Sequence, residues 1–232
     1  VTYGVSIWPA ICIKVSVISG KIVKQLVLDI ALPASPDFDN FVVGRNAELV
    51  QQLRAIADGS AVQKMLYVWG EPGSGRTHLL KAAVEVCTFP ALYIKGGEDV
   101  IEGLNARLIA IDDVETLDDA AQIAAFHLYN RLREEGGAFM ASGSVAPSQL
   151  ALRADLRTRL TWGLVYNITR LTDEEKMEAL NHHAQQRGFE LKTDVANYLL
   201  RHGKRDMPGL IAVLDALDRY SLETKRPITL PL

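Results

Sequence analysis

The segment Trp69–Leu80, with the sequence WGEPGSGRTHLL, contains residues of the types and spacing that bind phosphate. Two glycines and a threonine match the fixed positions of the loop pattern G-x-x-x-x-G-K-[ST]. Such glycines let backbone N–H groups turn inward around an anion, and the helix that follows directs its positive end to the same place. We therefore predict a nucleotide-binding loop, whose contacts are Gly70, Pro72, Gly73, Ser74, Gly75, Arg76, Thr77 and His78.

Arg76 stands where the loop pattern has lysine. Arginine is cationic and can neutralise phosphate charge, but its planar guanidinium cannot place a compact ammonium between the β- and γ-phosphates. The substitution therefore favours nucleotide binding over hydrolysis. Thr77 is placed to reach a magnesium ion that arrives with the nucleotide.

An acidic pair, Asp112 and Asp113, ends the apolar run LIAIDD. A carboxylate at the end of a buried strand lies where Mg²⁺ and a hydrolytic water sit in phosphoryl-transfer sites. An ordinary acidic turn after a strand would have the same sequence. The presence of the phosphate loop favours the functional interpretation, with Asp112 and Thr77 near a nucleotide-bound Mg²⁺.

These residues need a scaffold, and short apolar runs alternate with helical patterns along the middle of the chain. We expect strands at 64–69, 91–94, 107–113, 138–142 and 164–168, and helices at 46–57, 77–87 and 118–134. In the last helix, apolar residues recur at helical spacing: Ile123, Phe126, Leu128 and Leu132. Strands that alternate with helices imply an α/β fold with a parallel sheet covered on both faces.

After Arg170 the pattern changes to helices without strands. The first expected helix has Thr172 as its N-cap, acidic residues in its first turn and Gly188 at its end. Two further helical patterns follow, and the last begins near Asp206 and Pro208. The sequence therefore predicts a small all-α subdomain after the α/β domain.

The composition is that of a globular protein with nearly balanced charge. The 232 residues carry a net charge of −3 and no long block of Lys and Arg, which argues against a dedicated nucleic-acid binder. The two cysteines, Cys12 and Cys87, lie far apart and fit a reducing cytoplasm. We expect a cytoplasmic protein without a membrane partner.

The first residues, 1–24, form an apolar leader of unclear status. Pro9 and Lys14 interrupt it before the length of a membrane span, and no basic segment precedes it as in a signal peptide. A short hairpin, an extension, and a natural translation start near Val23 all remain open.

Five motifs in order give a family resemblance: FDNFVVGRNAELV, YVWGEPGSGRTHLL, IAIDDVE, LRTRLTWGLVYNI and the helical C-terminal part. Together they resemble the DnaA family of AAA+ ATPases, and more closely its Hda group, which inactivates the initiator DnaA. The resemblance implies an AAA+ P-loop parallel-sheet domain at 37–169 and a helical lid at 170–232. No helix-turn-helix pattern follows the lid helices, so direct sequence-specific DNA binding is not expected.

The resemblance also assigns roles to single residues. Val42 and Val43 match apolar contacts to the adenine, and Arg159 matches an arginine finger that acts on the γ-phosphate of a neighbouring subunit. A surface arginine in an ion pair is the alternative for Arg159. Two positions depart from the family pattern. The first sensor position holds Ser144, which cannot carry charge, and the second sensor position holds Pro208.

The segment 25–36 resembles a clamp-binding peptide followed by a linker. Its sequence QLVLDI resembles the peptide by which Hda proteins dock on the DNA polymerase III sliding clamp (β subunit). In an extended chain, alternate apolar residues lie on one side, suited to a shallow groove. An edge strand of the core is equally compatible with this pattern. The predicted clamp contacts are Gln25, Leu26, Leu28 and Ile30.

The combined expectation is a regulator that holds ADP or ATP, with Mg²⁺ carried by the nucleotide, docks on the clamp and stimulates ATP hydrolysis by DnaA. The alternative is an AAA+ ATPase of the helicase-loader type that acts by its own turnover. The third hypothesis is a plain adaptor, in which the nucleotide is only structural and the surface recruits a partner. The sequence leaves open whether the chain forms a homo-oligomer.

Overall fold

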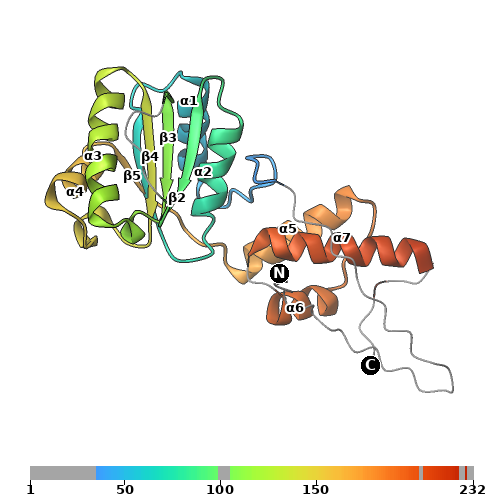
Figure 1. Ribbon diagram of the computed structural model, residues 1–232. Coiled ribbons are helices and arrows are strands. Elements are labelled where there is room, and N and C mark those ends of the chain that lie inside the picture. Colours follow the sequence, from blue (N-terminus) through green and yellow to red (C-terminus); the bar gives the residue numbers. More distant parts are fainter. Residues whose placement is uncertain (1–34, 99–104, 204–205, 225–227, 229–232) are drawn as a thin grey trace, which may run out of the picture.

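The computed structural model describes residues 35–98, 105–203, 206–224 and 228. The leader, the predicted clamp-binding residues and Arg205, the cation three residues before Pro208, lie outside the described residues. A parallel sheet covered by helices is followed by a separate group of helices, as the sequence predicts (Figure 1).

All five predicted strands are present and form one sheet. Their order is β2-β3-β4-β1-β5, and every neighbouring pair is parallel. The neighbouring interior strands β3 and β4 are buried at every position, which explains their continuous apolar sequence. The strands are β1 Met65–Trp69, β2 Ala91–Lys95, β3 Leu108–Asp112, β4 Ala138–Gly143 and β5 Leu164–Asn167.

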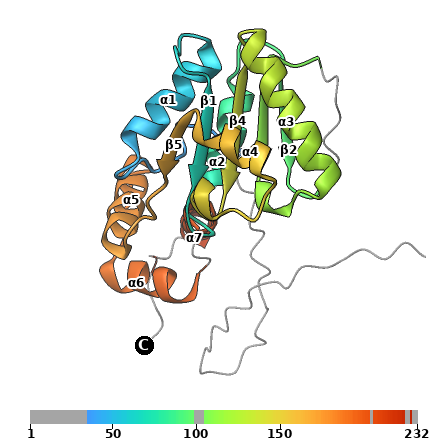
Figure 2. The same ribbon diagram turned by 90° about the vertical axis from the view of Figure 1, so that its left-hand side faces the viewer.

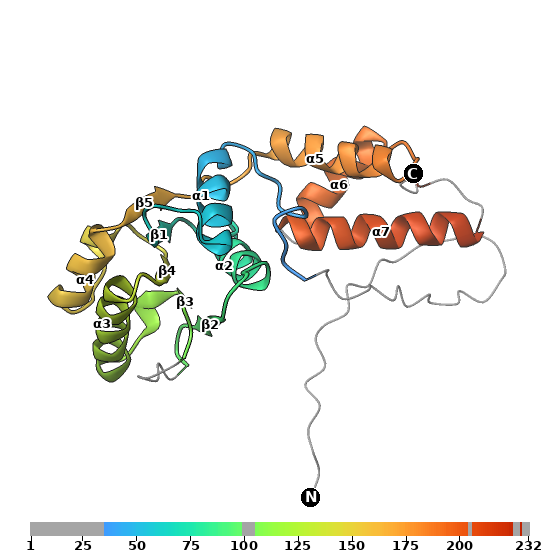
Figure 3. The ribbon, with the colours of Figure 1, turned by 90° about the horizontal axis from the view of Figure 1, so that it is seen from above.

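Helices cover both faces of the sheet, as Figure 3 shows from above. One face packs on helices α1 (Ala47–Asp58) and α2 (Arg76–Glu85), and the other on α3 (Asp119–Glu134) and α4 (Ala154–Thr161). Each face has its own buried apolar cluster, so burial on both sides holds the sheet in place.

The apolar pattern of α3 only partly predicts its buried face. Leu128 and Leu132 are buried, but Ile123 is 39% exposed and Phe126 is half-buried. Small residues, among them Ala125, cover the sheet instead because they allow the helix to approach it closely. The short helix α4 was not predicted, because it buries only two apolar residues and most of its sequence is polar.

The C-terminal helices α5 (Asp173–Gln186), α6 (Thr193–His202) and α7 (Met207–Thr224) pack around a third apolar cluster. Thr172 and Glu175 form a capping box at the start of α5, which confirms the predicted N-cap. In α7 the Gly209 N–H donates to the Asp206 carboxylate at 2.8 Å, so the first turn is capped and tolerates proline. Figures 1 and 2 show these lid helices beside one end of the sheet domain.

Candidate nucleotide-binding site

The phosphate-loop segment joins the end of β1 to the start of α2. Gly75 is the N-cap of α2 and has φ +105°, a conformation that L side chains rarely adopt. A Cβ at this position would lie 2.7 Å from Phe41 Cε2, so only glycine fits. The loop therefore lies at the carboxyl end of a parallel sheet and before a helix N-terminus, where open α/β sheets bind ligands.

The Arg76 side chain turns toward the acidic residues that follow β3. Its Nη2 lies 3.1 Å from Asp113 Oδ1, and its Nη1 lies 4.0 Å from Glu115 Oε1. The residue is only 9% exposed, so the ion pairs are poorly screened by solvent. The loop thus carries a buried cation whose partners are the protein's own carboxylates.

Asp112 is buried and accepts hydrogen bonds from two hydroxyl groups. The Tyr93 hydroxyl donates to Oδ2 at 2.7 Å, and the Ser142 hydroxyl donates to Oδ1. Burial, and then the hydrogen bond to Asp112, raise the pKa of Tyr93, so the phenol remains a donor. Each oxygen of Asp112 thus has a hydroxyl partner within the protein and one lone pair left for a further contact.

Asp113 lies in the left-handed region, with φ +49°, and is the single non-glycine residue with positive φ in the described part of the chain. Its carboxylate faces Arg76, and its N–H donates to Ser142 Oγ at 3.1 Å. Burial and the nearby Asp112 raise the pKa of Asp113, while Arg76 opposes this change. Aspartate tolerates this conformation better than most residues, and such backbone geometry is typical of functional sites.

Ser144, the predicted first sensor, contacts the site through its backbone. Its N–H donates to Glu115 Oε1 at 2.8 Å. The serine hydroxyl that touches the acidic pair belongs to Ser142 in β4, which sequence reasoning did not identify. Since Ile111 pairs with Ala141, the next residues along the two strands, Asp112 and Ser142, are brought side by side.

The polar atoms of the loop suit an anion. Ser74 Oγ and Arg76 Nη1 are buried and have no hydrogen-bond partner among the residues that the structure describes. Buried polar atoms are normally satisfied, so these two atoms are the loop's candidates for contact with a nucleotide phosphate. No group of three His, Cys, Asp or Glu side chains in the described ranges could hold a metal ion by itself. Thr77, the loop residue predicted to reach a nucleotide-bound magnesium ion, is exposed.

The predicted adenine-side residues lie between the two domains. Val42 packs against the lid cluster, and Val43 packs against the cluster of the sheet domain. His78 ties this segment to α2, because its Nε2 lies 2.8 Å from the Asp37 carbonyl oxygen and its ring lies 5.4 Å from that of Phe41. The structure thus brings the segment and the loop together.

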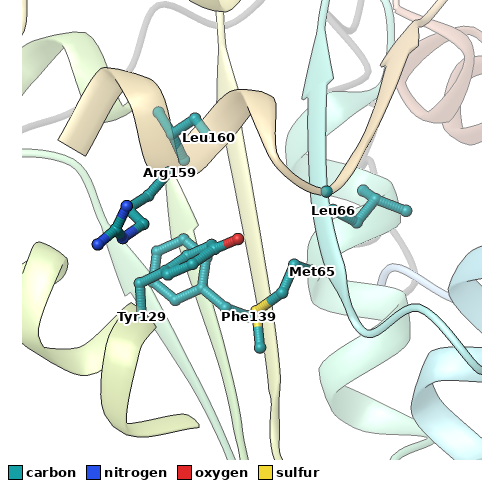
Figure 4. Close-up of a pocket in the computed structure, with 7 residues that line it drawn as sticks. Met65, Leu66, Tyr129, Phe139, Arg159 and Leu160 are labelled. Atoms are coloured by element: carbon teal, nitrogen blue, oxygen red, sulfur yellow. The ribbon is translucent and has the colours of Figure 1, made fainter. Parts of the chain in front are cut away.

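Arg159 lies at the end of β1 opposite the phosphate loop. It belongs to α4 and lines a small crevice with Met65 and Leu66 at the start of β1 and Phe139 at the start of β4 (Figure 4). The phosphate loop follows the opposite, carboxyl end of β1. The structure therefore separates Arg159 from the chain's own loop by the length of the sheet.

The Arg159 guanidinium is held by aromatic and amide partners. Its Nε donates to Asn130 Oδ1 at 2.8 Å, and its central carbon lies 3.9 Å from the Trp162 ring centroid. The same carbon lies 5.2 Å from the Phe126 ring centroid. Such cation–π contacts orient the guanidinium without neutralising its charge. None of these three partners is a carboxylate, so these contacts differ from the ion pair of the alternative interpretation.

The fold and the loop define a P-loop protein of the AAA+ class, with a parallel-sheet domain and a helical lid. Domain III of DnaA from Thermotoga maritima superposes with a TM-score of 0.66 at 22% identity, covering 85% of this chain and 93% of that one. AMPPCP-bound DnaA from Aquifex aeolicus superposes with a TM-score of 0.64 at 20% identity, covering 84% of this chain and 71% of that one. At these identities the likeness establishes the fold.

The family is established by sequence. An uncharacterised protein from Haemophilus influenzae is 35% identical over 222 residues, which are 90% of this chain and 96% of that protein. Residues 173–232 match the family described as "Hda, lid domain". The chain belongs to the family of the Haemophilus protein and is an Hda-like, DnaA-homologous AAA+ protein. In the described part of the chain, no helix is long and apolar enough to cross a membrane.

Proposed function

We propose that this chain holds ADP or ATP in the loop of residues 70–77 and stimulates ATP hydrolysis by DnaA, so that replication does not restart. In this proposal the hydrolysed nucleotide belongs to DnaA, and Arg159 is the arginine finger supplied in trans. The first part draws support from the buried, unsatisfied Ser74 and Arg76 atoms and from the family of the chain.

The position of Arg159 carries the second part of the proposal. A five-residue strand such as β1 spans roughly 13 Å, which is longer than an arginine side chain. Arg159 contacts the first residues of β1, whereas the phosphate loop follows the last. A guanidinium at this place serves a nucleotide on another subunit far better than its own. An arginine finger stabilises the charge that develops on the transferred phosphoryl group.

The residues around the loop favour holding a nucleotide over hydrolysing it. Asp112 is engaged by two hydroxyl groups, and the loop cation is paired with Asp113. The first turn of α7 has Pro208, which has no charge to offer the phosphates. We infer that turnover by this chain alone is slow or absent.

Docking on the sliding clamp through Gln25–Ile30 is part of the proposal and rests on the sequence resemblance. Bound at the clamp on DNA, the chain would meet DnaA in the cytoplasm where replication has begun. Replacing Gln25 with alanine is expected to abolish stimulation when the clamp is required and to leave nucleotide binding unchanged.

The test measures ATP hydrolysis by DnaA in the presence of DNA-loaded clamp and the full chain. Arg159→Ala is expected to lower the stimulation at least tenfold, within the range lost with an arginine finger. The matched control is Arg157→Ala, which removes the same charge from the same helix and is expected to retain most stimulation. Equal stimulation of DnaA hydrolysis by wild type and Arg159→Ala would refute the proposal that Arg159 is an arginine finger. High turnover by the chain without DnaA would favour the helicase-loader alternative.

A further inference from the structure

The segment of residues 168–171, which joins β5 to the lid, contacts the phosphate loop directly. The Ile168 N–H donates to the Trp69 carbonyl at 2.8 Å. The Ile168 side chain packs so closely on the loop that a Cβ at Gly70 would lie 2.6 Å from its Cγ2. The backbone of the phosphate loop at Gly70 therefore packs directly against the Ile168 side chain. Residues 168–171 are called the hinge segment below.

Two further residues of the hinge segment, Thr169 and Leu171, contact the stretch that precedes α1. Thr169 exchanges two hydrogen bonds with the Asn46 side chain, at 2.9 and 3.0 Å. Leu171 packs against Gly44, where a Cβ would lie 2.7 Å from Leu171 Cδ2. Both contacts fix the segment to the stretch before α1, so Arg170 between them has a defined place.

Arg170 extends over the phosphate loop. Its Nη1 lies 2.8 Å from Glu71 Oε2, and its Nη2 lies 3.3 Å from the place that a Cβ of Gly73 would take. Glu71 and Gly73 are both residues of the loop itself. A second cation, besides Arg76, is thus available at the loop, and it is contributed by the segment that leads into the lid.

We propose that Arg170 is the cation that senses the terminal phosphate of a bound nucleotide and transmits its presence to the lid. The inference rests on nucleotide binding as proposed above. The second sensor position holds Pro208, which cannot offer a cation to the phosphates. The inference assigns that cationic contact to Arg170 in the hinge segment instead.

The energetics allow Arg170 to exchange partners. The side chains of Arg170 and Glu71 are 44% and 72% exposed, so their ion pair contributes little to stability. A terminal phosphate carries more charge than a carboxylate and accepts the paired N–H groups of a guanidinium. The phosphate therefore competes well for Arg170, whereas Arg76 is itself buried and faces two carboxylates, Asp113 and Glu115.

The exchange also explains how the lid would respond. Arg170 is two residues before the N-cap of α5, Thr172. A shift of its side chain from Glu71 toward a phosphate therefore pulls on the start of the first lid helix. ATP, with one more phosphate than ADP, would engage Arg170 more strongly and hold the lid more rigidly.

The test measures binding of ADP and of AMPPCP to the full chain by calorimetry. Arg170→Gln is expected to weaken AMPPCP binding about tenfold or more, the loss typical for a charge-assisted hydrogen bond, and ADP binding less. Glu71→Gln removes the competing carboxylate and is expected to strengthen AMPPCP binding. A second readout is amide hydrogen exchange in the first turn of α5, which AMPPCP should slow in wild type and not in Arg170→Gln.

The matched control is Arg153→Gln. Its side chain is 43% exposed and pairs with Asp155 near α4, away from the loop, so binding should equal wild type. If wild type binds nucleotide and Arg170→Gln binds AMPPCP equally well, this inference is wrong and the proposed function stands. If wild type binds neither nucleotide, the nucleotide part of the proposed function is wrong and the role of Arg170 falls with it.

Discussion

Arg76 Nη2 lies 3.1 Å from Asp113 Oδ1, so the cation of the phosphate loop is paired with the second acidic residue after β3. This contact joins the phosphate loop directly to the acidic pair that follows β3. It also means that an incoming phosphate and Asp113 compete for the same guanidinium. Nη1 is buried, has no hydrogen-bond partner among the described residues and lies 4.0 Å from Glu115 Oε1, so a phosphate at Nη1 would compete with Glu115 as well.

Replacing Arg76 tests whether the loop depends on this cation. Arg76→Ala is expected to lower nucleotide affinity at least tenfold, because a buried charge-assisted contact to phosphate is lost. Arg76→Lys keeps the charge and is expected to retain most of the affinity. Calorimetry with ADP measures both. Unchanged affinity in Arg76→Ala would show that the guanidinium serves only to balance Asp113 and Glu115.

The pH dependence of stability should report the environment of Asp113. Burial and Asp112 raise its pKa above 3.8, with Glu115 adding to the effect and Arg76 and Lys95 opposing it. A raised pKa means that the folded state holds the proton more tightly than the unfolded state. The stability contribution of protonated Asp113 is therefore complete below pH 3.8 and is lost as pH rises through the raised pKa.

Asp113→Asn removes this titration, so the unfolding free energy of the variant relative to wild type should increase as pH rises above 3.8. Urea unfolding at several pH values measures the difference. Asp155→Asn is the control with opposite sign, because backbone and Arg153 hydrogen bonds lower the pKa of Asp155. Its stability contribution is lost as pH falls, so Asp155→Asn should lose relative stability as pH rises. Parallel curves for Asp113→Asn and wild type would contradict the assignment.

The fold was largely predictable because it depends on local patterns. Strands β3 and β4 are buried on both faces and therefore read as unbroken apolar runs, and Thr172 and Asp206 mark helix starts by local hydrogen bonds. Helix α4 was missed because Leu156 and Leu160 are too few to form a pattern.

The site was predictable only where motifs are continuous in sequence. Ser142 meets Asp112 through the register of two neighbouring strands, and register is not written in the spacing of either run. Arg170 and Glu71 are 99 positions apart, and the direction of a long side chain across that separation has no local signal. The predicted Ser144 is two residues from the serine that makes the contact.

Gly75 should be intolerant of any side chain. Its φ of +105° strains an L-residue, and an added Cβ would lie 2.7 Å from Phe41 Cε2. Gly75→Ala is expected to lower the unfolding free energy by about 1–3 kcal/mol and to prevent nucleotide binding. Gly136→Ala is the matched control, since its φ is +71° but nothing lies within 4 Å of its Cβ position. It should lose some stability and keep nucleotide binding. Binding by Gly75→Ala at wild-type affinity would show that the loop adapts.

The charged network inside the lid gives a prediction that is independent of nucleotide. Asp218 is 6% exposed and accepts from Arg187 Nε at 3.0 Å. Arg187 Nη1 lies 3.4 Å from Asp215, which in turn lies 2.7 Å from His183 Nε2. These four side chains connect α5 to α7, the two longest lid helices in the described part of the chain.

Asp218→Ala should therefore lower the unfolding free energy of the lid by about 1–3 kcal/mol, because Arg187 loses a charged partner in a buried place. Asp173→Ala, at an exposed pair with Lys176, should cost about 0.5 kcal/mol or less. Urea unfolding of the full chain measures both, and amide exchange in α5 and α7 locates the loss. A cost for Asp218→Ala no larger than that for Asp173→Ala would mean that the apolar cluster alone holds the lid helices together.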